Sequence, residues 1–274
     1  MMIRLSRCRC MIFLLFFLLA DTLNTDLSTA GPAVWLLCPL AAGLALPVYH
    51  IFMDFNRRLG ILADILLLLF ALWSLGQMVA DFTGLLRTYN DFIRNPALIG
   101  LLLLATSFYL SRLHGRGLAR TAELFFWPAA AVLLWAFCVG LADCDFGRLL
   151  PIDLWGAPQG ILWLLVKVFA QGILVLAVLE KEVSREELDI AMRSGTQLTG
   201  LVLGLFLAKD IAQVGWNMAS RYSYPLYALA GLNRSGTGMH IEDLLICALL
   251  MARLIKGALL LRLIEDILNR QRKE

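Results

Sequence analysis

The segment Leu154–Leu179 reads LWGAPQGILWLLVKVFAQGILVLAVL, and it decides the fold class. It contains a single charged side chain, Lys167, between the flanking acids Asp153 and Glu180. About 20 mostly apolar residues are enough for a helix to cross the hydrocarbon core of a bilayer. A run this long and this apolar therefore predicts a membrane-spanning helix.

Seven further apolar runs extend this pattern along the chain. Hydrophobic residues make up 60% of the 274 positions and charged residues 16%, whereas soluble domains carry about a quarter charged residues. The predicted spans are approximately 8–21, 32–53, 61–80, 96–111, 124–141, 154–179, 194–214 and 244–264. Only short loops remain between them, so residues 1–274 are predicted to form one all-α transmembrane domain with about eight spans.

Basic residues are distributed unevenly among the loops between these spans. With a cytoplasmic N-terminus, the cytoplasmic loops hold fourteen of the 24 Lys and Arg residues and the outer loops hold five. Cytoplasmic loops of membrane proteins carry an excess of Lys and Arg. The distribution predicts an integral membrane protein with both termini in the cytoplasm. It also supports the count, because gaining or losing one span would scramble the alternation.

Three segments outside the clear spans carry their own predictions. The N-terminal run Met11–Ala20 follows three arginines as in a signal peptide, but no small-x-small cleavage site follows it, which favours an uncleaved first span. The charge-dense segment Glu180–Arg193 is amphipathic and predicts a short cytoplasmic surface helix. The outer segment Gly215–His240 carries three tyrosines suited to the membrane interface, and a re-entrant hairpin is an alternative there.

Motifs typical of enzymes and metal sites are absent from the sequence. It contains no P-loop, no G-x-G-x-x-G and no H-E-x-x-H pattern. The pair Cys8-x-Cys10 has neither a second cysteine pair nor a nearby histidine to complete a metal site. The chain is therefore predicted to be no enzyme, to need no cofactor or metal, and to bind membrane lipid but no nucleic acid.

Charged residues inside the spans are the first functional signal. A basic side chain at mid-bilayer costs about 2.5–3.5 kcal/mol on insertion scales, so such side chains usually face the bundle interior, a partner or a water-filled path. The candidates for ion or proton coupling are Lys167, Lys209, Asp210, Arg253 and Lys256. The alternative for each is snorkelling to the nearer interface, and that alternative is favoured for Arg262.

The spacing of these charges suggests how they point. Lys209 and Asp210 are adjacent, so they leave a helix about 100° apart and are expected not to pair with each other. Arg253 and Lys256 are three residues apart and share one helix face. Two like charges on one buried face predict an acid or an anion opposite.

Irregularities in two spans are the second signal. Span one loses its apolar character at Ala20–Thr25, and span six contains Gln171-Gly172 past its middle. Transporters often bind substrate and ions where paired spans unwind at mid-membrane, because backbone groups are free there. Spans one and six would be the corresponding elements of a five-plus-five inverted repeat.

Several short motifs, taken in order, resemble one family. The run Gly115–Phe126 (GRGLARTAELFF) resembles the segment before the fifth span of spore-germination permeases, the B subunits of nutrient germinant receptors in the amino acid–polyamine–organocation superfamily. Further similar motifs, spread over nearly the whole chain, are Ala30–Trp35, Leu149–Pro151, Tyr224-Pro225, and Ile241–Leu245 with Lys256 in the following helix.

The resemblance implies a fold like that of the sodium-coupled leucine transporter and a small nutrient, such as an amino acid, sensed or conducted during spore germination at the inner spore membrane or the bacterial cell membrane. It also implies the receptor's A subunit and lipoprotein C subunit as partners. The nutrient would lie between spans one and six, near Thr22, Asn24, Gln171 and Gly172. Two departures stand out: eight spans appear instead of ten, so the last two are expected to be missing, and Gln171-Gly172 replaces a glycine–glutamate pair.

Two other functions remain open from the sequence. One is a proton-coupled amino acid transporter of the same superfamily, for which Lys167, Lys209 and Asp210 are suitable titrating groups because burial shifts pKa values. The other is a membrane subunit that does not transport and acts in assembly or regulation.

Overall fold

The fold is described by a computed structural model of the chain. It covers residues 7–22, 31–89, 95–113, 115–150, 157–180, 182–222, 224–232 and 241–271. Within these ranges all regular secondary structure is helical, which confirms the prediction of an all-α protein.

The helices follow one another with short connections. Their bounds are α1 Arg7–Thr22, α2 Val34–Leu59, α3 Ile61–Tyr89, α4 Pro96–Ser111, α5 Gly115–Leu141, η1 Phe146–Leu149, α6 Ala157–Lys167, η2 Phe169–Gln171, α7 Gly172–Leu179, α8 Arg185–Val214, α9 Trp216–Ala219, α10 Pro225–Leu232 and α11 Ile241–Gln271.

Six helical segments in the described part of the chain are long and apolar enough to cross a bilayer. They lie within α2, α3, α5, the α6–α7 pair, α8 and α11, and α1 and α4 are shorter apolar helices of 16 residues each. Large apolar side chains are also exposed on the outer faces, for example Leu69 on α3, Leu101 on α4 and Leu124 on α5. Exposure of so large an apolar surface to water is unfavourable. The chain is an integral membrane protein.

Helix boundaries differ from the predicted spans mainly at polar ends. The predicted separate surface helix at Glu180–Arg193 is wrong, because α8 runs unbroken from Arg185 through Val214. Likewise α3 continues to Tyr89 and α5 begins at Gly115. Hydropathy marks only the apolar part of a helix, whereas the backbone keeps its hydrogen bonds by remaining helical through the polar turns that follow.

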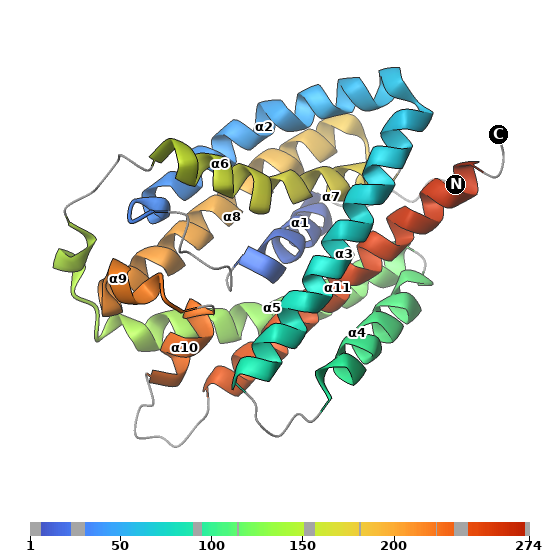
Figure 1. The fold of residues 1–274 in the computed structure, drawn as a ribbon. Coiled ribbons are helices and arrows are strands. Elements are labelled where there is room, and N and C mark those ends of the chain that lie inside the picture. The colour runs from blue at the N-terminus through green and yellow to red at the C-terminus, as the bar shows by residue number, and fades with distance from the viewer. Residues whose placement is uncertain are drawn as a thin grey trace.

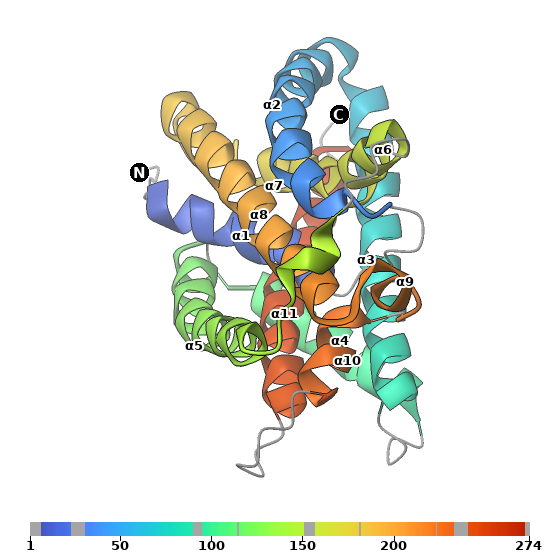
Figure 2. The same cartoon turned by 90° about the vertical axis from the view of Figure 1, so that its left-hand side faces the viewer.

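Helix α1 lies at the centre of the bundle (Figure 1). It packs against α5, α7, α8 and α11, and most of its side chains from Cys10 to Ala20 are buried. Helix α11 packs against α3, α4 and α5 as well as α1, and α2 packs along α8 and α6. Seen from the side, α1 is enclosed between α8, α5 and α11 (Figure 2). The short α10 buries Leu226 and Leu229 and contacts α11, α8 and α5.

Glycines of α8 allow the close contact between α8 and α2. A Cβ atom at Gly204 would lie 2.7 Å from the carbonyl oxygen of Trp35, and one at Gly200 would lie 2.9 Å from the carbonyl oxygen of Cys38. Small residues spaced four apart let two membrane helices approach to backbone contact. The Gly200-x-x-x-Gly204 pattern therefore fixes α8 directly on α2.

Ion pairs join helix ends that are far apart in the sequence. Arg9 of α1 lies 3.2 Å from Glu123 of α5, and Arg112 after α4 lies 3.1 Å from Glu265 of α11. Three further pairs are His50–Asp189 at 3.2 Å, Arg270–Asp64 at 3.5 Å, and Arg262–Glu182. These contacts involve the starts of α1, α3, α5 and α8 and the ends of α2, α4 and α11, which we treat as one group of helix ends.

The opposite group of helix ends is joined by contacts of the loop after α5 and of Tyr224. Gly140 at the end of α5 accepts a hydrogen bond from Gln213 at the end of α8, with a donor–acceptor distance of 2.7 Å. The backbone N–H of Asp145 donates to the carbonyl oxygen of Ala212 at 3.0 Å. The Tyr224 hydroxyl, just before α10, donates to the carbonyl oxygen of Asp81 in α3 at 3.3 Å.

Candidate functional site

The long apolar segment 157–179 is interrupted near its middle. Helix α6 ends at Lys167, a single 3-10 turn follows at Phe169–Gln171, and α7 begins at Gly172. This confirms the irregularity predicted at Gln171-Gly172. The residues around the turn keep helical backbone angles, so the segment tightens here and does not unwind. A 3-10 stretch within a helix often marks a functional hinge.

Tyr49 of α2 holds this turn in place. Its hydroxyl donates a hydrogen bond to the carbonyl oxygen of Phe169 at 2.6 Å, and its side chain is buried. The approach requires glycine at position 172, because a Cβ atom there would lie 2.7 Å from Cζ of the Tyr49 ring. Gly172, predicted to contact substrate, therefore serves in this structure to admit Tyr49.

Gln171 connects the turn to α11. Its Nε2 donates to the carbonyl oxygen of Lys167 at 3.0 Å, and its Oε1 accepts a hydrogen bond from Nζ of Lys256. The Gln171 side chain is 3% exposed and that of Lys256 is fully buried. We call Tyr49, Lys167, Phe169, Gln171, Gly172 and Lys256 the break site.

Aromatic rings of α1 and α3 lie against two buried cations of α11, Lys256 and Arg253. The Lys256 ammonium lies 4.9 Å from the centre of the Phe17 ring, and the Arg253 guanidinium lies 5.0 Å from the centre of the Phe82 ring. Attraction between a cation and a ring face is strongest where water is excluded, and both cations are fully buried. Arg253 and Lys256 share a buried face of α11, as expected. Each cation contacts a different aromatic ring, Phe82 for Arg253 and Phe17 for Lys256.

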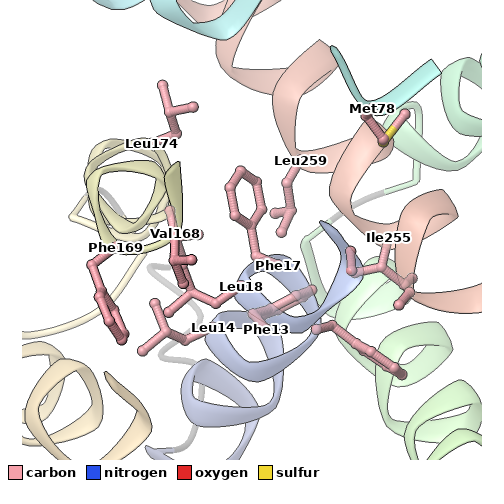
Figure 3. Packing of buried hydrophobic residues seen from close by; sticks show 14 of the residues in the cluster. Phe13, Leu14, Phe17, Leu18, Met78, Val168, Phe169, Leu174, Ile255 and Leu259 are labelled. Carbon is pink, nitrogen blue, oxygen red and sulfur yellow. The ribbon is translucent and has the colours of Figure 1, made fainter. Parts of the chain in front are cut away.

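Apolar side chains of α1 seal the break site from the other side. Leu14 and Leu18 point toward Val168 and Phe169 at the turn, and Phe17 points toward Leu259 of α11 (Figure 3). The Gln171–Lys256 contact therefore sits in an apolar surrounding. An amide oxygen bound to an ammonium is a strong, charge-assisted hydrogen bond in such an environment.

Lys167 takes part through its backbone and not through a buried charge. Its carbonyl oxygen accepts from Gln171, whereas its side chain is partly exposed at the end of α6. Arg253 and Lys256, by contrast, are fully buried.

Lys209 and Asp210 form a second buried polar group, at the opposite end of α8 from Arg185. The Lys209 Nζ lies 3.3 Å from Oδ1 of Asp210, and each side chain is 2% exposed. The expectation that the two cannot pair is wrong, because the long lysine side chain bends back across the angle between neighbouring helix positions. The Phe206 ring centre lies 5.9 Å from the same Nζ.

This ion pair is anchored by the loop that follows α5. The Cys144 Sγ lies 3.2 Å from the carbonyl oxygen of Gly140 and 3.7 Å from that of Lys209, and Arg148 donates a hydrogen bond to the carbonyl oxygen of Gln213. The pair and the break site thus occupy different parts of the bundle. Of the five predicted coupling residues, the structure brings only Lys167 and Lys256 together with Gln171.

The remaining predicted substrate contacts fall largely outside the described residues. Thr22 is the last described residue of α1, but its side chain is not among those described, and Asn24 lies outside them altogether. Their predicted contacts with a nutrient stay predictions.

Tyr49 was missed by the sequence reasoning. It stands in an apolar run two residues after Pro47, with no charge nearby. A hydroxyl-bearing aromatic residue near the end of such a run was the available signal. Its partner is a backbone carbonyl of a distant span, which no local pattern reveals.

Comparison with known proteins adds no family to this description. No protein-family model matches the chain, and no curated protein matches it. Among the described residues, no group of three or more His, Cys, Asp or Glu side chains could hold a metal ion. The fold and the site define an all-α integral membrane protein with a buried cation–amide contact at an interrupted helix.

Proposed function

We propose that this chain is the membrane subunit of a nutrient receptor of the spore-germination permease type, which senses or conducts a small nutrient such as an amino acid. The observation that carries the proposal is the interrupted helix α6–α7, held by Tyr49 and joined to the buried Lys256 through Gln171. Discontinuous helices at mid-membrane are where transporters of this type bind substrate.

The packing pattern supports a fold like that of the leucine transporter. Such a fold would relate α1 to α6–α7, α2 to α8, and α3 to α11 as two inverted repeats. The observed contacts agree with this repeat symmetry. Helix α2 packs on α8 and α3 packs on α11, and the α1–α8 contact corresponds to the contact of α6 with α2. The motifs that resemble the permease family point the same way.

The helix-end contacts support eight spans with both termini in the cytoplasm. In that topology, the starts of α1, α3, α5 and α8 and the ends of α2, α4 and α11 lie on the cytoplasmic side. The five ion pairs between helix ends all join segments of this group. The contacts of Asp145 and Tyr224 join segments assigned to the outer side.

The buried Lys256 supports a nutrient that carries a carboxylate. A carboxylate could accept from the Lys256 ammonium, which donates up to three hydrogen bonds, and from the second N–H of the Gln171 amide, so the Gln171–Lys256 contact is kept. A small amino acid brings such a carboxylate at little volume. The A and C subunits of the receptor are the proposed partners.

Binding to the purified protein tests this proposal. A panel of amino acids is first screened by ligand-dependent thermal stabilisation, and each hit is titrated calorimetrically into wild type and Gln171→Leu. We expect the substitution to weaken binding about tenfold or more, because one charge-assisted hydrogen bond is worth about 1.5–3 kcal/mol.

The matched control is Ser107→Ala. Ser107 is buried in α4, and its hydroxyl makes no hydrogen bond to the described residues. The control should bind as wild type does. If wild type and Gln171→Leu bind every amino acid found in the screen with equal affinity, the assignment of the site is wrong.

A proton-coupled amino acid transporter is the second candidate, favoured by the buried Lys209–Asp210 pair. Uptake into proteoliposomes should then rise with an imposed pH gradient, and Asp210→Asn should abolish that rise. The exposed Asp143→Asn is the control. Uptake indifferent to the gradient would exclude this candidate.

A further inference from the structure

A separate cavity lies between α2, α7 and α8. It has a volume of about 230 Å³ and is lined by Leu46, Tyr49, His50, Leu176, Arg185 and Asp189, among others. Drug-sized ligands occupy pockets of roughly 300–1,000 Å³, so this cavity suits a smaller molecule. Neither Gln171 nor Lys256 lines it.

The polar groups of the cavity lie at its rim and the apolar groups form its walls. Arg185 and Asp189 are four residues apart at the start of α8, so they are neighbours on one helix face. Both side chains are exposed, and Oδ1 of Asp189 lies 3.2 Å from Nε2 of His50 on α2. Leu46, Leu176 and the buried Tyr49 supply apolar surface further in.

We propose that this cavity is a second ligand site, which binds a small zwitterion with an apolar side chain, such as a neutral amino acid. The carboxylate of the ligand pairs with the Arg185 guanidinium, which suits carboxylates because it can offer two parallel N–H donors. The ammonium pairs with the Asp189 carboxylate, and the apolar side chain lies against Leu46 and Leu176. A ligand with only one of the two charges binds only one of the two rim residues, Arg185 or Asp189.

Tyr49 connects this cavity to the break site. Its ring lines the cavity, and its hydroxyl holds the carbonyl oxygen of Phe169 in the 3-10 turn. A ligand in contact with Tyr49 changes the conformation of that turn at Phe169, which lies two residues before Gln171. The cavity is therefore an effector site for the break site, on the side of the bundle where His50 and Asp189 pair.

Titration of three probes into the full-length protein in lipid nanodiscs tests the inference. The probes are L-leucine, 4-methylpentanoate, which lacks the ammonium, and 3-methylbutylamine, which lacks the carboxylate. The Gln171→Leu background removes the contribution of the break site. In this background leucine should bind, and each single-charge analogue should bind about tenfold more weakly or worse.

Substitutions at the rim make the test specific. Arg185→Gln and Asp189→Asn should each weaken leucine binding at least about tenfold, and both residues are exposed, so the fold is kept. The matched controls are Arg193→Gln and Glu186→Gln, exposed residues of α8 that do not line the cavity. The inference is overturned if both rim variants bind leucine like the controls, or if either analogue binds as well as leucine.

This design distinguishes failure of the break site from failure of the second ligand site. Loss of a binding component only in Gln171→Leu supports the proposed function and speaks against the second site. Loss only in Arg185→Gln and Asp189→Asn supports the second site and speaks against the proposed one.

Discussion

Gln171 and Lys256 meet by a hydrogen bond from the Lys256 ammonium to the amide oxygen of Gln171, in a place that water does not reach. The contact ties the turn between α6 and α7 to α11. Burying an ammonium is unfavourable unless its donors find acceptors, so the amide oxygen stabilises a charge that the surrounding helices would otherwise disfavour.

A double-mutant cycle measures this contact. Gln171→Leu should destabilise the protein by about 1.5–3 kcal/mol, because a buried ammonium loses an acceptor. Lys256→Met alone leaves the amide oxygen unsatisfied, and the double variant removes both partners. We expect the double variant to be more stable than the sum of the single effects predicts, by about 1 kcal/mol or more. Thermal unfolding in one detergent gives all four values, and strict additivity would contradict the contact.

Gly172→Ala should displace Tyr49 and loosen the turn. The added methyl group would lie 2.7 Å from Cζ and 3.1 Å from Cε1 of the Tyr49 ring, both shorter than an ordinary van der Waals contact. The loss should reach about 1–3 kcal/mol, as for other overpacked positions. Gly43→Ala is the control, because its Cβ would meet nothing within 4 Å, and alanine favours a helix by about 1 kcal/mol.

Rescue separates the steric effect from any other. Tyr49→Leu removes the ring that the methyl group would strike. In that background Gly172→Ala should cost little in melting temperature. An equal loss with tyrosine or leucine at position 49 would mean that the glycine serves another purpose.

Apolar run length was sufficient to find the helices but not their contacts. The run 96–111 gave the bounds of α4 as the structure has them, because hydropathy falls sharply at Asn95 and Arg112. At α8 the same reasoning placed a boundary near Ser194 where none exists. A change from polar to apolar surroundings alters which side chains suit a helix and does not end the helix.

Part of the site followed from sequence and part could not. Gln171 and Lys256 were each selected, one for an irregular span and the other for a charge in an apolar run. Their pairing depends on how α7 and α11 approach, which is a tertiary property. The Lys209–Asp210 prediction failed because Cα geometry was used where side-chain length decides the contact.

Gly204→Ala should force α8 away from α2. Its Cβ would lie 2.7 Å from the Trp35 carbonyl oxygen, a backbone atom that no rotamer change can move. We expect a lower melting temperature and a loss of about 1–3 kcal/mol. Gly76→Ala, with open space around its Cβ, is the control. An unchanged melting temperature for Gly204→Ala would show that the two helices are not in backbone contact.

Cysteine labelling tests the proposed orientation. Arg112 and Arg148 are both exposed but belong to opposite groups of helix ends. In a chain whose own cysteines are replaced, Arg148→Cys should react with an impermeant maleimide in intact cells. Arg112→Cys should react only after the membrane is opened. The reverse pattern would invert the topology, and reaction of both in intact cells would break the proposed span count.

Cys144 offers a pH-dependent test of the loop that anchors α8. Burial raises the pKa of its thiol, the neighbouring Lys209 lowers it, and Asp210 and Asp143 raise it. Because only the thiolate reacts with maleimide, a raised pKa leaves less reactive thiolate at a given pH. With Cys144 as the sole cysteine, labelling near neutral pH should be slower in the folded protein than after unfolding in detergent, and the two rates should converge as the pH rises.

Two substitutions test the neighbouring charges. Lys209→Met removes the charge that lowers the pKa of Cys144, so it should slow labelling further, whereas Asp210→Asn should speed it. A labelling rate that neither substitution changes would mean that the loop does not lie next to the Lys209–Asp210 ion pair.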